Sequence, residues 1–228
     1  MTTATREALS RRVRRNGLAL LPAPIVAGAV LLLTVGAPPL APLALGAAGW
    51  VVALIPRQPV ALLAMRRVGK ERIGPVVGWF SGPAEELVRL ALVALVIRSQ
   101  PQAVWAGFGW AAVEAVMIAV NTLLISTLIQ KDDPKAQEAR SMMEAQGMFR
   151  PVHPALGFAE RLSATALHIG FTLLLLASPW FVLLTIPAHS ITNMGAVRLA
   201  KSNLRMTEVL LAAEGVLALV VGAVLSSR

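Results

Sequence analysis

Residues 75–97 of this chain read PVVGWFSGPAEELVRLALVALVI. The stretch is as long as a transmembrane helix, which needs roughly 20 mostly apolar residues. It nevertheless carries three ionisable side chains, Glu85, Glu86 and Arg89. A charged side chain inside a bilayer costs ~2.5–3.5 kcal/mol on insertion scales, so each one needs a partner or a function. The stretch therefore predicts a membrane helix whose polar residues contact other parts of the protein.

The composition of the whole chain agrees with this prediction. Of 228 residues, 56% are hydrophobic and 14% are charged, and the mean hydropathy is +0.69. This balance excludes a water-soluble fold of the same size. The chain has no cysteine, which excludes disulfides, thiolate catalysis and sulfur-ligated metals. Any chemistry must use Glu, Asp, His, Ser, Lys or Arg.

Other apolar stretches of comparable length follow one another along the chain. We place the predicted membrane spans at residues 17–36, 40–55, 75–97, 101–129, 154–177, 179–197 and 208–225. The pattern predicts an all-α, polytopic transmembrane bundle of about seven spans, with residues 1–228 forming a single membrane domain. The polar motifs fall within about residues 75–200, and residues 130–152 are predicted to form a cytoplasmic loop.

The basic residues predict the orientation in the membrane. Lys and Arg number 21 against 12 Asp and Glu, a net charge of +9. Most of them gather in alternate gaps between the spans, beginning with the Arg-rich segment 6–15. The positive-inside rule then places the N-terminus in the cytoplasm, and we expect a multi-pass protein of the cell (plasma) membrane. Nucleic-acid binding is disfavoured, because no aromatic residues alternate with the basic ones.

Polar side chains also occur inside the later spans. They are Glu114, Glu160, Arg161, His168, His189 and Asn193. At a rise of 1.5 Å per residue, Glu85, His168 and His189 fall roughly 12–21 Å from the cytoplasmic ends of their spans. We therefore expect these three residues in one layer, with Glu114 slightly above it.

Local spacing predicts how these side chains are held. Glu85 and Arg89 are four residues apart with the acid first, the better orientation for a helical ion pair. Pro83 and Pro187 each precede a polar residue by two positions, and each frees a backbone carbonyl one turn earlier. Freed carbonyls in a span are tolerated beside protein or water, so the sequence predicts a hydrated cavity.

The chemistry that fits this set of residues is hydrolysis. Glu85, with Glu86 assisting or substituting, can act as a general base, and His168 can help to orient a water for attack on a carbonyl. His189 and Asn193 can donate hydrogen bonds to the resulting oxyanion. The residues predicted to support this site are Arg89, Glu114, Glu160 and Arg161.

The same residues carry a family resemblance. Glu85-Glu86-Leu87-Val88-Arg89, His168 and His189-Ser190-Ile191-Thr192-Asn193 resemble the signatures of the CAAX-protease and bacteriocin-processing (CPBP) intramembrane proteases. Gly107-Phe108-Gly109 before Glu114, and Glu160-Arg161 before His168, resemble the YhfC-type membrane peptidases. The resemblance implies an intramembrane endopeptidase in which Glu85 and His168 activate water while His189 and Asn193 bind the oxyanion. Its substrate would be a membrane-associated peptide or protein.

Three alternatives remain open at the level of sequence. A zinc ion could be held by Glu85, His168 and His189, although the His-Glu-x-x-His helix of typical zinc proteases is absent. A small transporter subunit could use the same groups as a proton or cation path. A catalytically silent scaffold would need only their mutual packing. The hydrolytic scheme itself requires no cofactor, and the sequence leaves the oligomeric state open.

Overall fold

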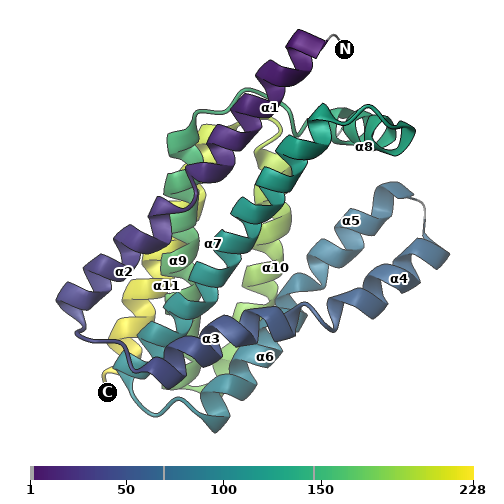
Figure 1. Cartoon of the computed structure of the whole chain (residues 1–228). Coiled ribbons are helices and arrows are strands. Elements are labelled where there is room, and N and C mark those ends of the chain that lie inside the picture. The colour runs from purple at the N-terminus through teal and green to yellow at the C-terminus, as the bar shows by residue number, and fades with distance from the viewer. Residues whose placement is uncertain (1–2, 69, 146) are drawn as a thin grey trace.

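A computed structural model describes residues 3–68, 70–145 and 147–228 of the chain. Within these ranges all of the secondary structure is helical, which confirms the all-α prediction (Figure 1). The elements are α1 (Thr3–Leu18), α2 (Pro22–Thr34), α3 (Leu40–Ala53), α4 (Arg57–Arg67), α5 (Lys70–Trp79), α6 (Ser81–Leu95), α7 (Gln100–Gln130), α8 (Pro134–Ala145), α9 (Pro154–Ala177), the 3-10 helix η1 (Pro179–Phe181), α10 (Val182–Leu199) and α11 (Leu204–Ser226).

Five segments in the described part of the chain are long and apolar enough to cross a membrane. They are Ala4–Thr34 (α1 and α2), Leu40–Arg67 (α3 and α4), Gln100–Gln130 (α7), Pro154–Ala177 (α9) and Leu204–Ser226 (α11). This finding supports a membrane protein. The expected spans at residues 75–97 and 179–197 correspond to α5 with α6 and to α10, which are not among the five. One reason is that a turn at Phe80 leaves α6 only 15 residues long.

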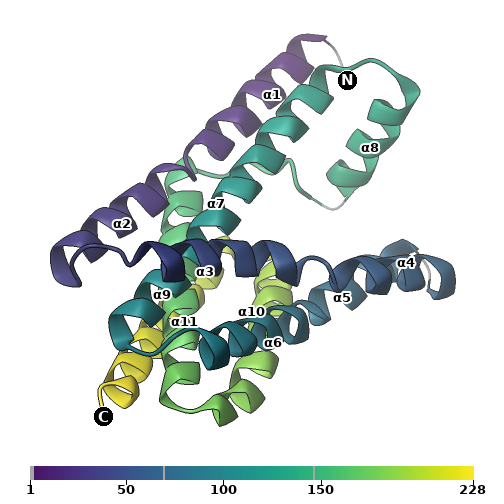
Figure 2. The same cartoon turned by 60° about the horizontal axis from the view of Figure 1, so that its bottom comes forward.

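The helices that carry the predicted site residues are neighbours. α7, α9 and α11 pack side by side (Figure 1). α3 crosses α7, and α10 packs along α6 (Figure 2). α6 also contacts α9, so α6, α7, α9 and α10 surround a common interior. The apolar part of that interior includes Val93, Ile97, Ala103, Val104, Ile169 and Leu173.

Glycines allow these helices to approach closely. A Cβ atom at Gly107 on α7 would lie 2.6 Å from the Cα atom of Ile169 and 2.9 Å from the carbonyl oxygen of His168, both on α9. A Cβ atom at Gly82 on α6 would clash with Ser190 on α10. Larger residues would separate the helices at both crossings. The two glycines therefore set the distances between the polar residues on the four helices.

The N-terminal helix is attached to the far end of α7. α1 packs along α7, where the Ser10 hydroxyl donates to the carbonyl oxygen of Ser126 at 2.7 Å. Arg6 forms an ion pair with Asp132 at 2.6 Å, and the hydrogen bond from Arg6 holds the pKa of Asp132 below its usual value. The loop expected at residues 130–152 begins here and contains α8.

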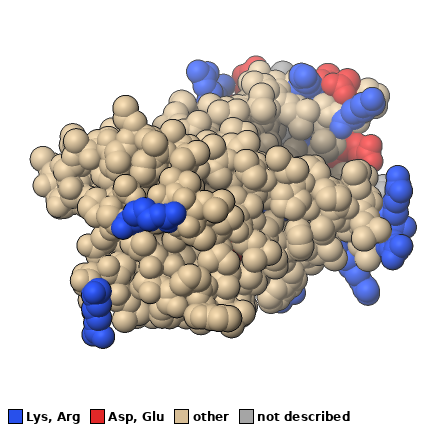
Figure 3. Space-filling model, turned by 90° about the horizontal axis from the view of Figure 1, so that it is seen from below, with Lys and Arg blue, Asp and Glu red and all other residues tan. Residues whose placement is uncertain are grey.

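Charged side chains are unevenly distributed over the surface. Seen from below, most of the molecule is uncharged, and Lys and Arg side chains gather at the edge where α4 and α5 end (Figure 3). Large apolar side chains such as Leu33, Leu95 and Trp180 are mostly exposed. A soluble monomer rarely exposes so much apolar surface, whereas a protein that contacts lipid does so over its membrane belt.

Candidate functional site

Glu86 and Arg89 form an ion pair inside the bundle. Both residues lie on α6, three positions apart, and their side chains are 0% and 1% exposed. The Nε atom of Arg89 donates to the two carboxylate oxygens of Glu86 at 3.2 and 3.3 Å. The sequence predicted Glu85 as the partner of Arg89, four positions away. That pairing is wrong, because the Glu85 carboxylate is bound to residues of other helices.

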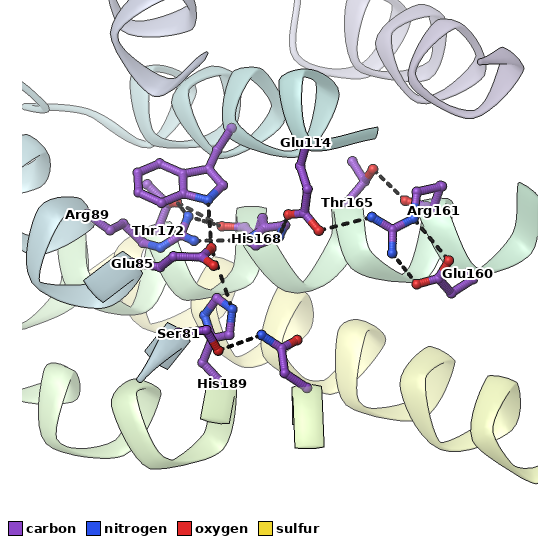
Figure 4. A network of polar contacts seen from close by, with 12 residues as sticks. Ser81, Glu85, Arg89, Glu114, Glu160, Arg161, Thr165, His168, Thr172 and His189 are labelled. Carbon is purple, nitrogen blue, oxygen red and sulfur yellow. Dashed lines mark hydrogen bonds and ion pairs between the residues drawn. The ribbon is translucent and has the colours of Figure 1, made fainter. Parts of the chain in front are cut away.

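The remaining donors of Arg89 connect α6 to α9 and α7. Its Nη1 atom donates to the Thr172 hydroxyl at 3.1 Å and to the carbonyl oxygen of His168 at 3.3 Å, and its Nη2 atom lies 2.8 Å from Nδ1 of His168 (Figure 4). The guanidinium carbon lies 4.2 Å from the centre of the Trp110 ring, a cation–π contact. Arg89 therefore holds three helices together through one side chain.

The contact with Arg89 determines the tautomer of His168. A guanidinium has only donors, so Nδ1 of His168 must accept and cannot carry a hydrogen. The hydrogen of the neutral ring is then on Nε2, which donates to Oε2 of Glu114 at 2.7 Å. His168 is thus a neutral bridge between Arg89 and Glu114, with both ring nitrogens engaged.

His189 lies between the two neighbouring glutamates of α6. Its Nδ1 atom is 2.7 Å from Oε1 of Glu86, and its Nε2 atom is 3.5 Å from Oε2 of Glu85. The centres of the His189 and His168 rings are 5.7 Å apart. The structure therefore brings together four of the five predicted catalytic residues, although they come from three helices.

The Glu85 carboxylate has two hydrogen-bond partners that were not predicted from the sequence. Glu85 is only 4% exposed, and it accepts hydrogen bonds from Nη1 of Arg57 at 3.2 Å and from the indole nitrogen of Trp110 at 3.3 Å. Trp110 lies well inside α7, away from the membrane interfaces that tryptophan prefers. This unusual position was the sign in the sequence that Trp110 contacts a polar group. Arg57 gave no such sign, because it resembles any basic residue at the end of a span.

Glu114, Arg161 and Glu160 extend the network toward a more exposed flank. Nη1 of Arg161 donates to Oε1 of Glu114 at 3.0 Å, and its Nε donates to Oε2 of Glu160 at 3.1 Å (Figure 4). Arg161 Nη2 also contacts the other Glu160 oxygen. The Glu114 and Glu160 side chains are 18% and 32% exposed, compared with 5% for Glu85. Water can therefore approach the network from the Glu160 side.

The formal charges of the network nearly cancel. Its ion-paired groups are the carboxylates and guanidiniums of Glu85, Glu86, Glu114, Glu160, Arg57, Arg89 and Arg161. These groups give four negative and three positive charges. One further proton on His189, which faces two carboxylates, makes the whole set neutral. A neutral set is what a weakly solvated interior tolerates best.

Asn193, the fifth predicted catalytic residue, is engaged elsewhere. Its amide nitrogen donates to the Ser81 hydroxyl at 2.9 Å, and that hydroxyl donates to the carbonyl oxygen of Gly78 at 2.6 Å. These contacts hold α10 against the start of α6. In this arrangement the Asn193 amide is bound to Ser81 and not to the acids of the site.

Three side chains of the site surround a point that one small ligand can occupy. One atom each from Glu85, Glu114 and His168 lie within 4.8 Å of one another. A water that forms two hydrogen bonds of about 2.8 Å at a tetrahedral angle spans about 4.6 Å. Because Nε2 of His168 is already bound to Glu114, a single water fits between the carboxylates of Glu85 and Glu114. The sequence had assigned Glu114 to a supporting position.

The same group lacks the hydrogen bonding that a zinc site needs. A histidine that binds metal through one ring nitrogen usually donates the hydrogen of its other nitrogen to an acceptor. Nδ1 of His168 instead faces Arg89, which can only donate. Among the described residues, the group that could hold a metal contains Glu114 and not His189, which the sequence predicted as a ligand. With Nδ1 accepting from Arg89, this donor set does not fit zinc.

Comparison with known proteins adds no assignment. No family model, curated protein or solved structure matches the chain. The resemblance to the CPBP and YhfC-type proteases thus rests on the short motifs quoted above, and it stays a prediction.

Proposed function

We propose that the protein is an intramembrane endopeptidase that hydrolyses a peptide bond with a water held between Glu85 and Glu114, where His168 orients the Glu114 carboxylate. The observation that carries the proposal is the 4.8 Å grouping of these three side chains. Two carboxylates that share one water, one of them oriented by an imidazole, are elements of general-base hydrolysis. The peptide nature of the substrate comes from the motif resemblance, and the apolar surroundings favour a membrane-associated peptide or protein.

Each group has a defined task in the proposed reaction. Glu85 takes a proton from the water, whose oxygen attacks the carbonyl carbon of the substrate. His189, protonated between its two glutamates, donates from Nε2 to the oxyanion. The C–N bond then breaks, and the proton on Glu85 passes to the leaving amine. Arg57 and Trp110 hold the Glu85 carboxylate in position throughout, and no metal takes part.

The proposal includes the finer topology. The α5–α6 pair and α10 would complete seven crossings, with the N-terminus in the cytoplasm and the protein in the plasma membrane. The distribution of basic residues supports this orientation. This orientation places the arginines of α1 on the same side of the membrane as the basic ends of α4 and α5.

Cleavage by matched variants tests the proposal. The protein in lipid nanodiscs is incubated with a mixture of membrane proteins and apolar peptides, and new termini are identified by mass spectrometry. We expect the wild type and the control Glu138→Gln, an exposed glutamate on α8, to produce the same termini. Glu85→Gln and His168→Gln should produce none. Equal cleavage by Glu85→Gln would reject the assignment.

A catalytically silent scaffold is the second candidate, and one observation favours it. The ionisable side chains of the network are already paired with one another, and Asn193 is bound to Ser81. Such pairing alone would fix the packing of the helices. Complementation separates the two candidates: if Glu85→Gln restores the phenotype of a deletion strain as well as the wild type does, the scaffold is the correct assignment.

A further inference from the structure

Helices α4 and α5 form an arm that differs from the rest of the molecule in its packing. α4 packs chiefly on α5, and Ala64 is its one buried residue. Leu62, Leu63 and Met65 of α4 are exposed. The two helices extend together away from the bundle (Figure 1). α5 also packs on α10, where Gly78 lies against Met194, so the arm is held to the bundle mainly through α5.

Both connections between the arm and the bundle are breaks in the helix. Residues 54–56 form a turn between α3 and α4, and Phe80 forms a turn between α5 and α6. Pro83 has no N–H group, so it cannot bond to the carbonyl of Trp79 four residues earlier. That carbonyl instead accepts a hydrogen bond from the Ser190 hydroxyl of α10 at 2.8 Å. The two breaks have the properties of a double hinge. Residues 54–56 carry hydrogen bonds of the 3-10 type, which often mark a hinge within a helix, and Pro83 removes one helical bond beside Phe80.

Arg57 connects this arm to the proposed site. It is the first residue of α4, directly beyond the break, and its Nη1 atom lies 3.2 Å from Oε1 of Glu85. The Arg57 side chain is 22% exposed, whereas that of Arg89 is 1% exposed. Rotation of the arm about its breaks would withdraw Arg57 from Glu85 and leave the rest of the network intact.

We propose that the arm is a hinged gate and that Arg57 is the positioning residue that couples the gate to Glu85. With the arm in place, Arg57 orients the Glu85 carboxylate toward the water site. With the arm displaced, the apolar segment of a membrane substrate can enter beside α6. The functional part of this inference rests on the proposed hydrolysis, but the motion of the arm does not.

The motion can be measured without any activity. Because the chain has no cysteine, Met65→Cys on α4 and Leu124→Cys on α7 provide two unique, exposed spin-label positions. Double electron–electron resonance gives the distance distribution between them in nanodiscs. Arg57→Gln should shift or broaden the distribution relative to the wild type, whereas Arg66→Gln, an exposed arginine of the same helix, should leave it unchanged. Identical distributions for wild type and Arg57→Gln would overturn the gate.

The coupling to Glu85 has its own measurement. If the wild type cleaves substrate, Arg57→Gln should lower kcat about 100-fold, the scale of a small misplacement of a reacting group. Arg57→Lys should recover part of that loss, and Arg66→Gln should cleave like the wild type. A distance shift without cleavage by the wild type would retain the gate and reject the protease. Cleavage with an unaffected kcat in Arg57→Gln would reject the coupling and retain the protease.

Discussion

Glu85 and Glu86 are neighbours on one helix, yet their surroundings differ. Glu86 is wholly buried and is bound by Arg89 of its own helix and by His189. Glu85 faces Arg57 from the arm, Trp110 and the water site, so its partners come from other parts of the chain. The difference teaches that one acid of the pair is enclosed within the bundle, while the other, bound by groups from other helices, is the one to which the proposed reaction assigns the role of general base.

The largest effect is expected at Arg89. Arg89→Met would leave Glu86 buried without its cation and His168 without its donor. Breaking a buried ion pair at one partner costs about 3–5 kcal/mol. We expect a strong loss of thermal stability in detergent, followed by tryptophan fluorescence. The double variant Glu86→Gln/Arg89→Met should regain much of that loss, and no recovery would contradict the pairing.

The second prediction separates the two acids directly. Glu85→Gln should lower kcat by about 10²–10⁴, the usual contribution of a general base, with little change in melting temperature. Glu86→Gln should lower the melting temperature, because a neutral amide no longer compensates Arg89. The two variants are compared in the same cleavage and unfolding assays. If Glu86→Gln lost activity without losing stability, Glu86 would be the base instead.

A smaller effect is expected at Trp110. Trp110→Phe keeps an aromatic face near Arg89 but removes the indole hydrogen bond to Glu85, worth about 1.5 kcal/mol for a charged acceptor. We expect kcat to fall about tenfold. Trp105→Phe is the matched control, since the buried indole nitrogen of Trp105 has no hydrogen-bond partner among the described residues. Equal losses in both variants would attribute the effect to ring size alone.

The smallest effect is expected on metal removal. Chelators and added zinc should leave cleavage and stability unchanged, because Nδ1 of His168 accepts from Arg89 and the ring is not set up for a metal. Nitrogen NMR of labelled histidine checks the same point, and His168 should show its hydrogen on Nε2. Stoichiometric zinc in the purified protein, with activity lost on its removal, would contradict this prediction.

The convergence of the site was predictable because it depends on topology. The length of each span and the rise per residue place Glu85, His168 and His189 at similar depths, whatever the details of packing. The all-α fold was also predictable, because repeated apolar stretches of span length indicate membrane helices. These predictions use only the regular geometry of a helix and the thickness of a bilayer.

The choice of partners was not predictable, because it depends on tertiary contacts. Spacings of three and four residues both permit an ion pair on a helix, so spacing alone selected the wrong glutamate as the partner of Arg89. Arg57, which comes from another helix, binds Glu85 instead. The break at Phe80 was likewise hidden, since hydropathy averages over the turn that divides residues 75–97.

The length of α7 has a consequence for how the protein sits in a bilayer. Its 31 residues extend about 46 Å, against about 30 Å for the hydrocarbon core. A tilt of 40°, near the limit for membrane helices, reduces that reach only to about 36 Å. At least one end of α7 must then reach beyond the hydrocarbon core, and α1 packs along the end near Gln130. The excess length therefore brings the last turn of α7 to the depth of the lipid headgroups, where the polar side chain of Gln130 can be solvated.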